Sequence, residues 1–311
     1  MPVDREGWHR QAIQLYRQGR YEEAISAFNQ VIALDPEDAV AWYGKGVVQR
    51  DLQRLDEALA AFDQALALDP TYAIAWVNKG SLLYRQQRYQ EALAACDQAL
   101  TLDYTLVPGW IDKGVVLIDL QRYVDALAAY ERAIALDPEA ANAWAGKGLA
   151  LLNLQDPEEA LAAFEHATAL DADNATSWYN KGLALRDLGR FEEALSAFEH
   201  ALVLDPTDAE AWNNKGLTLG DLKRNEEALT AFEQALTLEP ENVPVWVGKG
   251  LALYELRRNE EALAALDQAL ALDPRYTLTW NAKIAVLEQL GRAAEAQEAE
   301  RRRDEALSAG S

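Results

Sequence analysis

The sequence predicts an all-α protein, an α-solenoid built from stacked helix-turn-helix units. The main observation is a fixed period, because all nine tryptophans lie 34 residues apart. Each period also holds two stretches with the apolar spacing of a helix, separated by a short turn such as Leu188-Gly189-Arg190. Finally, the pattern W-x-x-K-G recurs in seven consecutive periods. Such a period is typical of repeat proteins, whose units bury their apolar sides against one another.

The first helix of each unit carries the tryptophan, at position 4 when a unit is numbered from 1 to 34. In residues 175–208, positions 4, 8 and 11 fall within a narrow arc, and further apolar positions widen it to most of the helix circumference. Such a helix must be covered on several sides. Position 8 is a glycine, which costs up to about 1 kcal/mol relative to alanine, so we expect another helix to approach closely there. We expect the tryptophan to fill the space beside this contact as a core residue.

The second helix is predicted to form the outer wall, because acidic residues occupy one of its faces. It commonly begins with Glu-Glu-Ala-Leu, and glutamates in a first turn interact favourably with the helix dipole. Units close with a pair such as Asp205-Pro206, in which the proline ends one helix and suits the start of the next.

The recurring residues resemble the pattern of the tetratricopeptide repeat. They are Trp at position 4, Gly at 8, Ala at 20, Phe at 24, Ala at 27 and Pro at 32, and position 20 is alanine in every unit. This resemblance implies a right-handed superhelix. It covers residues 5–310 as a single domain of nine units, with residues 293–308 as a charged C-terminal cap helix. The units are residues 5–38, 39–72, 73–106, 107–140, 141–174, 175–208, 209–242, 243–276 and 277–310.

A lysine stands at position 7 in eight units, where the tetratricopeptide pattern usually has leucine. An acid at position 31 of the preceding unit lies ten residues before each of these lysines, as Asp171 does before Lys181. We expect each lysine to pack its methylenes on the core and to pair with that acid or the neighbouring carbonyls, which would staple adjacent units together. The alternative is a ladder of lysines that lines a binding groove.

Composition limits the classes of partner. The net charge of -22 works against binding a phosphate backbone or an anionic membrane surface, so we expect no nucleic acid. No stretch approaches the ~18 to 20 apolar residues of a membrane span, so we expect no membrane insertion. The chain begins without a leader pattern, and we expect a cytoplasmic protein. The single cysteine, Cys96, takes a phenylalanine position and should be buried and inert.

No motif for catalysis or cofactor binding is present. The sequence lacks GxxxxGK[ST], GxGxxG, HExxH and CxxC, and its three histidines do not form a ligand pattern. We therefore expect no enzyme activity, no cofactor and no metal site.

The candidate binding residues lie on the first helices, because the resemblance implies that these helices line a concave groove. Their outward positions vary between units and are rich in acids, amides and tyrosines. The candidates are Tyr43, Asp51, Asn78, Tyr84, Asp112, Asp119, Tyr179, Asn180, Asp187, Asn214, Asp221, Tyr254 and Glu255. Such a groove suits a basic or amphipathic peptide. The alternative is that these acids only solvate an open helix face.

The sequence thus predicts a protein-protein interaction scaffold or adaptor. An alternative is self-association or partner binding through the convex face or the ends of the array. Tetratricopeptide repeat domains that bind chaperones have a carboxylate clamp, which resembles Lys at position 5 and Asn at position 9 of their first unit. No unit of this chain combines the two residues, so the resemblance implies no binding of a chaperone's acidic C-terminal tail. The partner's identity, the cellular process and the oligomeric state do not follow from the sequence.

Overall fold

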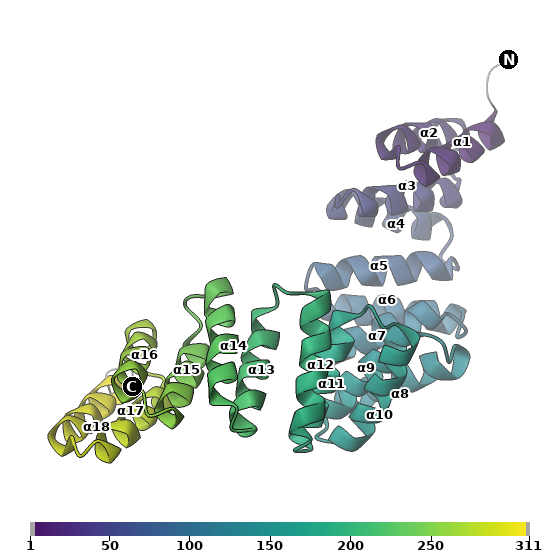
Figure 1. Ribbon diagram of the computed structural model, residues 1–311. Helices are drawn as coiled ribbons and strands as arrows, with labels where there is room; N and C mark the ends of the chain where they lie inside the picture. The colour runs from purple at the N-terminus through teal and green to yellow at the C-terminus, as the bar shows by residue number, and fades with distance from the viewer. Residues whose placement is uncertain (1–3, 309–311) are drawn as a thin grey trace. The chain divides into compact units, whose positions relative to one another are not determined.

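The computed structural model describes residues 4–308 and contains 18 α-helices and no strand within that range (Figure 1). The helices are α1 (Arg5–Arg17), α2 (Tyr21–Leu34), α3 (Ala39–Asp51), α4 (Leu55–Leu68), α5 (Ala73–Arg85), α6 (Tyr89–Leu102), α7 (Val107–Asp119), α8 (Tyr123–Leu136), α9 (Ala141–Asn153), α10 (Pro157–Leu170), α11 (Ala175–Asp187), α12 (Phe191–Leu204), α13 (Ala209–Asp221), α14 (Asn225–Leu238), α15 (Val243–Glu255), α16 (Asn259–Leu272), α17 (Thr277–Gln289) and α18 (Ala293–Ser308). The prediction of an all-α fold is confirmed.

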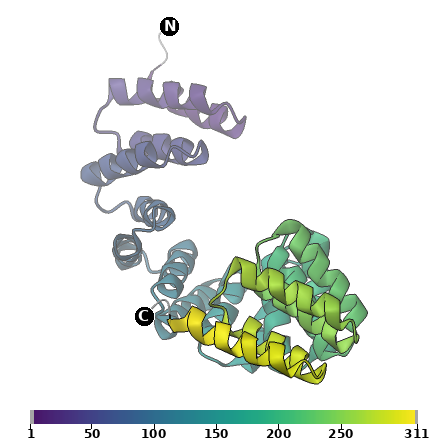
Figure 2. The ribbon, with the colours of Figure 1, turned by 90° about the vertical axis from the view of Figure 1, so that its left-hand side faces the viewer.

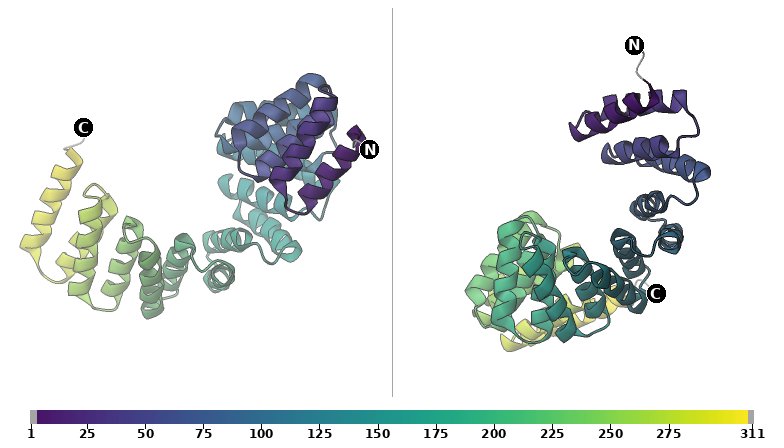
Figure 3. Two further views of the ribbon diagram at one scale, coloured as in Figure 1. Left: turned by 90° about the horizontal axis from the view of Figure 1, so that it is seen from above. Right: turned by 90° about the vertical axis from the view of Figure 1, so that its right-hand side faces the viewer.

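The chain divides into two compact parts, residues 1–155 with α1–α9 and residues 156–311 with α10–α18. From here on we call these parts the first and the second unit, and we call each 34-residue helix pair a repeat. Within each unit, an odd-numbered helix packs on the even-numbered helix that follows, and that helix also packs on the next odd-numbered one. Figures 2 and 3 show these stacked hairpins from other sides. Stacked helix pairs of this kind are the predicted solenoid architecture. The single uninterrupted domain over residues 5–310 stays a prediction, and its last two residues lie outside the described range.

The packing inside a hairpin explains the glycine at position 8. A Cβ built on Gly182 would lie 2.6 Å from a ring carbon of Phe198, the aromatic residue at position 24 of the same repeat. The alanine at position 20 is also enclosed, as at Ala194, which is fully buried. The small residues therefore let the two helices close over the phenylalanine, as the sequence predicts. Cys96 replaces this phenylalanine and is buried, as expected.

The turn inside each hairpin contains one residue with a left-handed backbone, at position 15. Gly19, Gly189 and Gly291 have φ of about 70° there, whereas Gln87 and five other non-glycine residues adopt φ near 60°. A residue in this left-handed conformation commonly follows the end of an α-helix, and it is usually glycine. The non-glycine residues hold it at an energetic cost.

Eight tryptophans, from Trp42 to Trp280, connect a first helix to the loop before it by a hydrogen bond. Seven of these eight side chains are half-buried rather than fully in the core. The indole Nε1 of Trp76 donates to the carbonyl oxygen of Pro70 at 3.0 Å, and the equivalent bond recurs from Trp42 to Trp280. The expectation of a core residue is correct only for Trp280, which is 7% exposed. The indole lies at the edge because its N–H must reach this carbonyl.

The lysines do bridge adjacent repeats, but the prediction that they pair with the acid at position 31 is wrong. Lys79 Nζ lies 2.7 Å from Asp63, which stands 16 residues earlier at position 25, and the same spacing joins five other lysines to an acid. Lys79 Nζ also lies 5.0 Å from the centre of the Trp76 ring. The predicted partner, Asp69, instead accepts hydrogen bonds from the backbone N–H and hydroxyl of Thr71. The acid at position 31 thus forms a local Asx turn, which satisfies its carboxylate without a lysine.

Candidate functional site

All thirteen predicted binding residues lie on first helices. In the first unit, Tyr43 and Asp51 are on α3, Asn78 and Tyr84 on α5, and Asp112 and Asp119 on α7. In the second unit, Tyr179, Asn180 and Asp187 are on α11, Asn214 and Asp221 on α13, and Tyr254 and Glu255 on α15. Each is half-buried or exposed. The structure separates them into residues that are engaged with neighbouring helices and residues that are free to meet a partner.

A tyrosine and an asparagine from successive first helices are hydrogen-bonded in both units. Asn78 Nδ2 donates to the Tyr43 hydroxyl at 3.2 Å, and Arg50 donates to the Asn78 Oδ1 at 2.5 Å. Asn214 repeats the arrangement in the second unit, where it donates to Tyr179 at 3.2 Å and accepts from Arg186 at 2.7 Å. These side chains therefore join one repeat to the next and have little hydrogen-bonding capacity left for a ligand.

A tyrosine and an aspartate form a second bridge, found in the first unit. The Tyr16 hydroxyl donates to Asp51 at 2.6 Å, and this bond together with burial raises the pKa of Tyr16 to about 12. Tyr84 is likewise hydrogen-bonded to Asp119, and burial followed by this bond raises its pKa to about 12. Asp51 is further paired with Arg50 at 2.9 Å. Two of the predicted groove acids are thus largely satisfied within the protein. The sequence contains a signal for both bridges, since each joins residues 35 apart.

Asp112 is the exception among the first-unit candidates. It occupies the position of Asn78, but the residue that would match Tyr43 is Val77, which offers no hydroxyl. Asp112 borders a cavity of about 20 Å³ together with Tyr84 and Ser81. Burial raises the pKa of its carboxyl group to about 6. The surroundings of Asp112 therefore oppose its negative charge.

The free acids lie in the second unit. Glu255 and Asp187 are exposed, and within residues 4–308 neither makes a hydrogen bond or an ion pair through its side chain. Asp221 is also exposed and has only a loose contact with Arg186, at 3.9 Å. Such carboxylates remain available to a cationic ligand.

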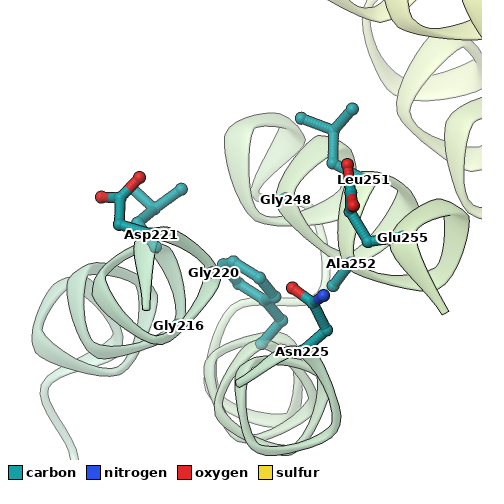
Figure 4. Close-up of a pocket in the computed structure, with 10 residues that line it drawn as sticks. Gly216, Gly220, Asp221, Asn225, Gly248, Leu251, Ala252 and Glu255 are labelled. Carbon is teal, nitrogen blue, oxygen red and sulfur yellow. The ribbon is translucent and has the colours of Figure 1, made fainter. Parts of the chain in front are cut away.

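Further cavities that the sequence did not predict open on the first-helix faces. In the first unit a cavity of about 320 Å³ is lined mainly by apolar and aromatic side chains, among them Tyr16, Tyr43, Phe28 and Val47, with Arg17 beside them. In the second unit a cavity of about 180 Å³ lies between α13 and α15 (Figure 4). Its lining residues are Gly216, Leu217, Gly220, Asp221, Asn225, Phe232, Gly248, Leu251, Ala252 and Glu255.

Within the described chain, no three His, Cys, Asp or Glu side chains are grouped so that they could hold a metal ion. Burial raises the pKa of the Cys96 thiol to about 12, which keeps it protonated and unreactive. None of the helices between residues 4 and 308 is long and apolar enough to cross a membrane.

Solved structures of known proteins resemble this fold. The chain is similar to YrrB, described as a TPR protein with an unusual peptide-binding site, at 28% identity and a TM-score of 0.51 over 60% of this chain and 95% of that one. It is similar to a chain in the structure of the APC/C hetero-tetramer Cut9-Hcn1 at 18% identity and a TM-score of 0.65, over 90% of this chain and 55% of that one. For a tetratricopeptide repeat protein from Parabacteroides merdae the identity is 17% and the TM-score 0.57, over 80% of this chain and 98% of that one. None of the curated proteins compared with the chain matches it.

The family model described as the tetratricopeptide repeat matches seven overlapping segments. They are residues 9–73, 48–105, 111–175, 146–209, 179–243, 213–277 and 247–307. These segments cover nearly the whole chain, and the helix pairs recur with the period read from the tryptophans. The chain therefore belongs to the tetratricopeptide repeat family.

Proposed function

We propose that the chain is a scaffold that binds a basic or amphipathic segment of a partner protein on the first helices of its second unit. The observation that carries this proposal is the contrast between engaged and free acids. Asp51 and Asp119 are hydrogen-bonded to tyrosines of the preceding repeat, whereas Asp187 and Glu255 have no such partner within the described residues. Glu255 also lines an apolar cavity, and an unpaired carboxylate there provides charge complementarity to a cationic segment.

The family supports a role in protein-protein interaction, and the likeness to YrrB supports a peptide as the bound form. Because proteins of this family are typically non-enzymatic scaffolds, we propose the same of this chain, and we expect a cytoplasmic location. Because Asp51, Asn78 and Asn214 help to join repeats, we assign them a structural role and propose that the exposed acids do the binding.

The test is a charge reversal of the free acids, with a matched control on the other helices. In one variant Asp187, Asp221 and Glu255 become lysine. In the control, three exposed glutamates on second helices become lysine, so that the change in net charge is the same. They are Glu158, Glu192 and Glu226. Circular dichroism would verify that both variants are folded.

Binding would be measured on an array of short synthetic peptides that vary in their content of lysine, arginine and leucine. We expect the wild type and the control to retain the basic amphipathic peptides. The variant with lysine at positions 187, 221 and 255, which we call the groove variant, should lose them. Equal retention by the groove variant would contradict the proposal, as would binding that only the control loses. The latter result would favour the second-helix surface, which is the alternative site.

A further inference from the structure

The cavity in the second unit arises from two departures from the repeat. Position 12 of a first helix carries a side chain larger than alanine in the eight other repeats, but here it is Gly220. Position 17, at the start of the second helix, is aromatic in four repeats, and here it is Asn225. A Cβ built on Gly220 would meet no atom within 4 Å, so this glycine, unlike Gly216 and Gly248, is not required by packing. The space is left open by the sequence.

The cavity has the volume for one long side chain. It measures about 180 Å³, compared with the ~150 Å³ of an engineered cavity that accommodates benzene. Leu217 and Leu251 line it from α13 and α15, and Phe232 of α14 contributes its ring. This apolar lining suits the methylenes of a lysine or an arginine, which are commonly buried along apolar surface while the charged end remains in a polar environment.

Polar groups are placed where the charged end would lie. Figure 4 shows the Asn225 carboxamide directed toward the space between α13 and α15, with Glu255 on the α15 side, whereas the Asp221 carboxylate points away from this space. Asn225 is half-buried and makes no hydrogen bond through its side chain within residues 4–308. Its amide oxygen and the Glu255 carboxylate are acceptors, and a guanidinium group supplies several donors in one plane.

We propose that this cavity is a subsite for a single arginine or lysine side chain of a bound peptide. The proposal rests on the proposed function and assigns the position at which the second unit would read a basic residue. The Glu255 carboxylate beside the cavity distinguishes this occupant from a purely apolar side chain, which the walls alone would accept. The chain's net charge of -22 adds a long-range attraction for the same cation.

The experiment uses the full chain labelled with ¹⁵N-glycine, because Gly216 and Gly248 line the cavity and report on it by NMR. The probe is a blocked heptapeptide with one central arginine flanked by glycine and serine, titrated into the millimolar range. A second peptide carries citrulline, which keeps the shape of arginine and lacks its charge. We expect the arginine peptide to shift the Gly216 and Gly248 signals, and citrulline to weaken binding by about tenfold or more.

The decisive variant is Gly220→Leu, which fills the cavity with the residue found at the equivalent Leu152. Because a Cβ at this position meets no atom within 4 Å and leucine is the better helix former, this variant should fold at least as stably as the wild type. We expect it to lose the response at Gly216 and Gly248, and we expect Gly220→Ala to retain it. An unchanged response in Gly220→Leu, or equal binding of citrulline and arginine, would overturn the subsite.

The two proposals fail in different ways. If the wild type retains basic peptides on the array but Gly220→Leu binds the arginine probe as well as wild type does, the subsite is wrong and the scaffold function stands. If the wild type retains no basic peptide, the proposed function itself is wrong.

Discussion

Replacement of Asp112 by asparagine should stabilise the protein, because the folded chain opposes this residue's negative charge. Burial raises the pKa of Asp112 from 3.8 to about 6. At 1.36 kcal/mol per pH unit, the gap between these values corresponds to about 3 kcal/mol. The folded chain binds this proton more tightly than the unfolded chain does. The free energy of unfolding therefore falls as the pH rises from about 4 to about 6, and the full penalty applies above that range.

Asparagine has nearly the same shape as the protonated acid, cannot ionise, and stands at this position in three other repeats, as Asn78, Asn180 and Asn214. For Asp112→Asn we expect a gain of about 3 kcal/mol in unfolding free energy at about pH 7.5, and about half of that at about pH 5. Urea unfolding followed by circular dichroism would measure it. Because repeat arrays do not always unfold in one step, hydrogen exchange of the α7 amides would give a local value.

The matched control is Asp187→Asn, which removes an exposed carboxylate from the second unit. Its effect should remain within about 0.5 kcal/mol at either pH, as is usual for surface substitutions. The reasoning is refuted if Asp112→Asn is no more stable than the wild type at about pH 7.5. It is also refuted if the gain is the same at both pH values, since a gain without pH dependence cannot come from ionisation.

Three further changes test the packing, the turns and the bridges between repeats. Gly182→Ala would place a Cβ 2.6 Å from a phenylalanine ring carbon, so it should lower the unfolding free energy by about 1 to 3 kcal/mol in thermal melts. The control is Gly220→Ala, whose Cβ has open space and which should raise the unfolding free energy by up to about 1 kcal/mol. Gln87→Gly relieves a left-handed backbone at φ of 60° and should raise the unfolding free energy in urea by about 1 kcal/mol, so a loss of stability would contradict the strain that we infer. A double-mutant cycle of Lys79→Met with Asp63→Asn should give a coupling free energy of up to about 1 kcal/mol, because Asp63 is half exposed. A cycle of Lys79→Met with Asp69→Asn should give no coupling. Coupling to Asp69 and none to Asp63 would contradict the bridge that we assign.

The helix pairs could be predicted because each residue that specifies them acts within one repeat. The glycine at position 8 and the aromatic residue at position 24 meet inside a hairpin, as Gly182 and Phe198 do, so spacing along the chain reveals the contact. The turn after the first helix is similarly local. Local rules of this kind hold in every copy, and repetition makes them visible in a single sequence.

Contacts between repeats could not be predicted in the same way, because they depend on how one hairpin is rotated against the next. Phe28 packs at Gly44, position 6 of the following repeat. The neighbouring position 25 therefore faces the lysine at position 7, as Asp63 faces Lys79. The acid at position 31 is just as regular, but its carboxylate is already satisfied by the adjacent turn, as Asp69 is by Thr71. Regularity alone did not separate a residue that bridges repeats from one that ends a helix.

The candidate binding residues divide for the same reason. The regular pairings, such as Tyr43 with Asn78, use polar side chains to connect repeats, so a variable surface position is not by itself a binding position. What a repeated scaffold can offer to one partner must come from the places where its repeats differ. Gly220 lacks a side chain and Asn225 is smaller than the aromatic residue of four other repeats, so a cavity is open there, and Glu255 leaves a carboxylate unpaired beside it within the described chain. These departures lower the burial of apolar surface without any gain in packing, which is the pattern expected of positions retained for recognition rather than for stability.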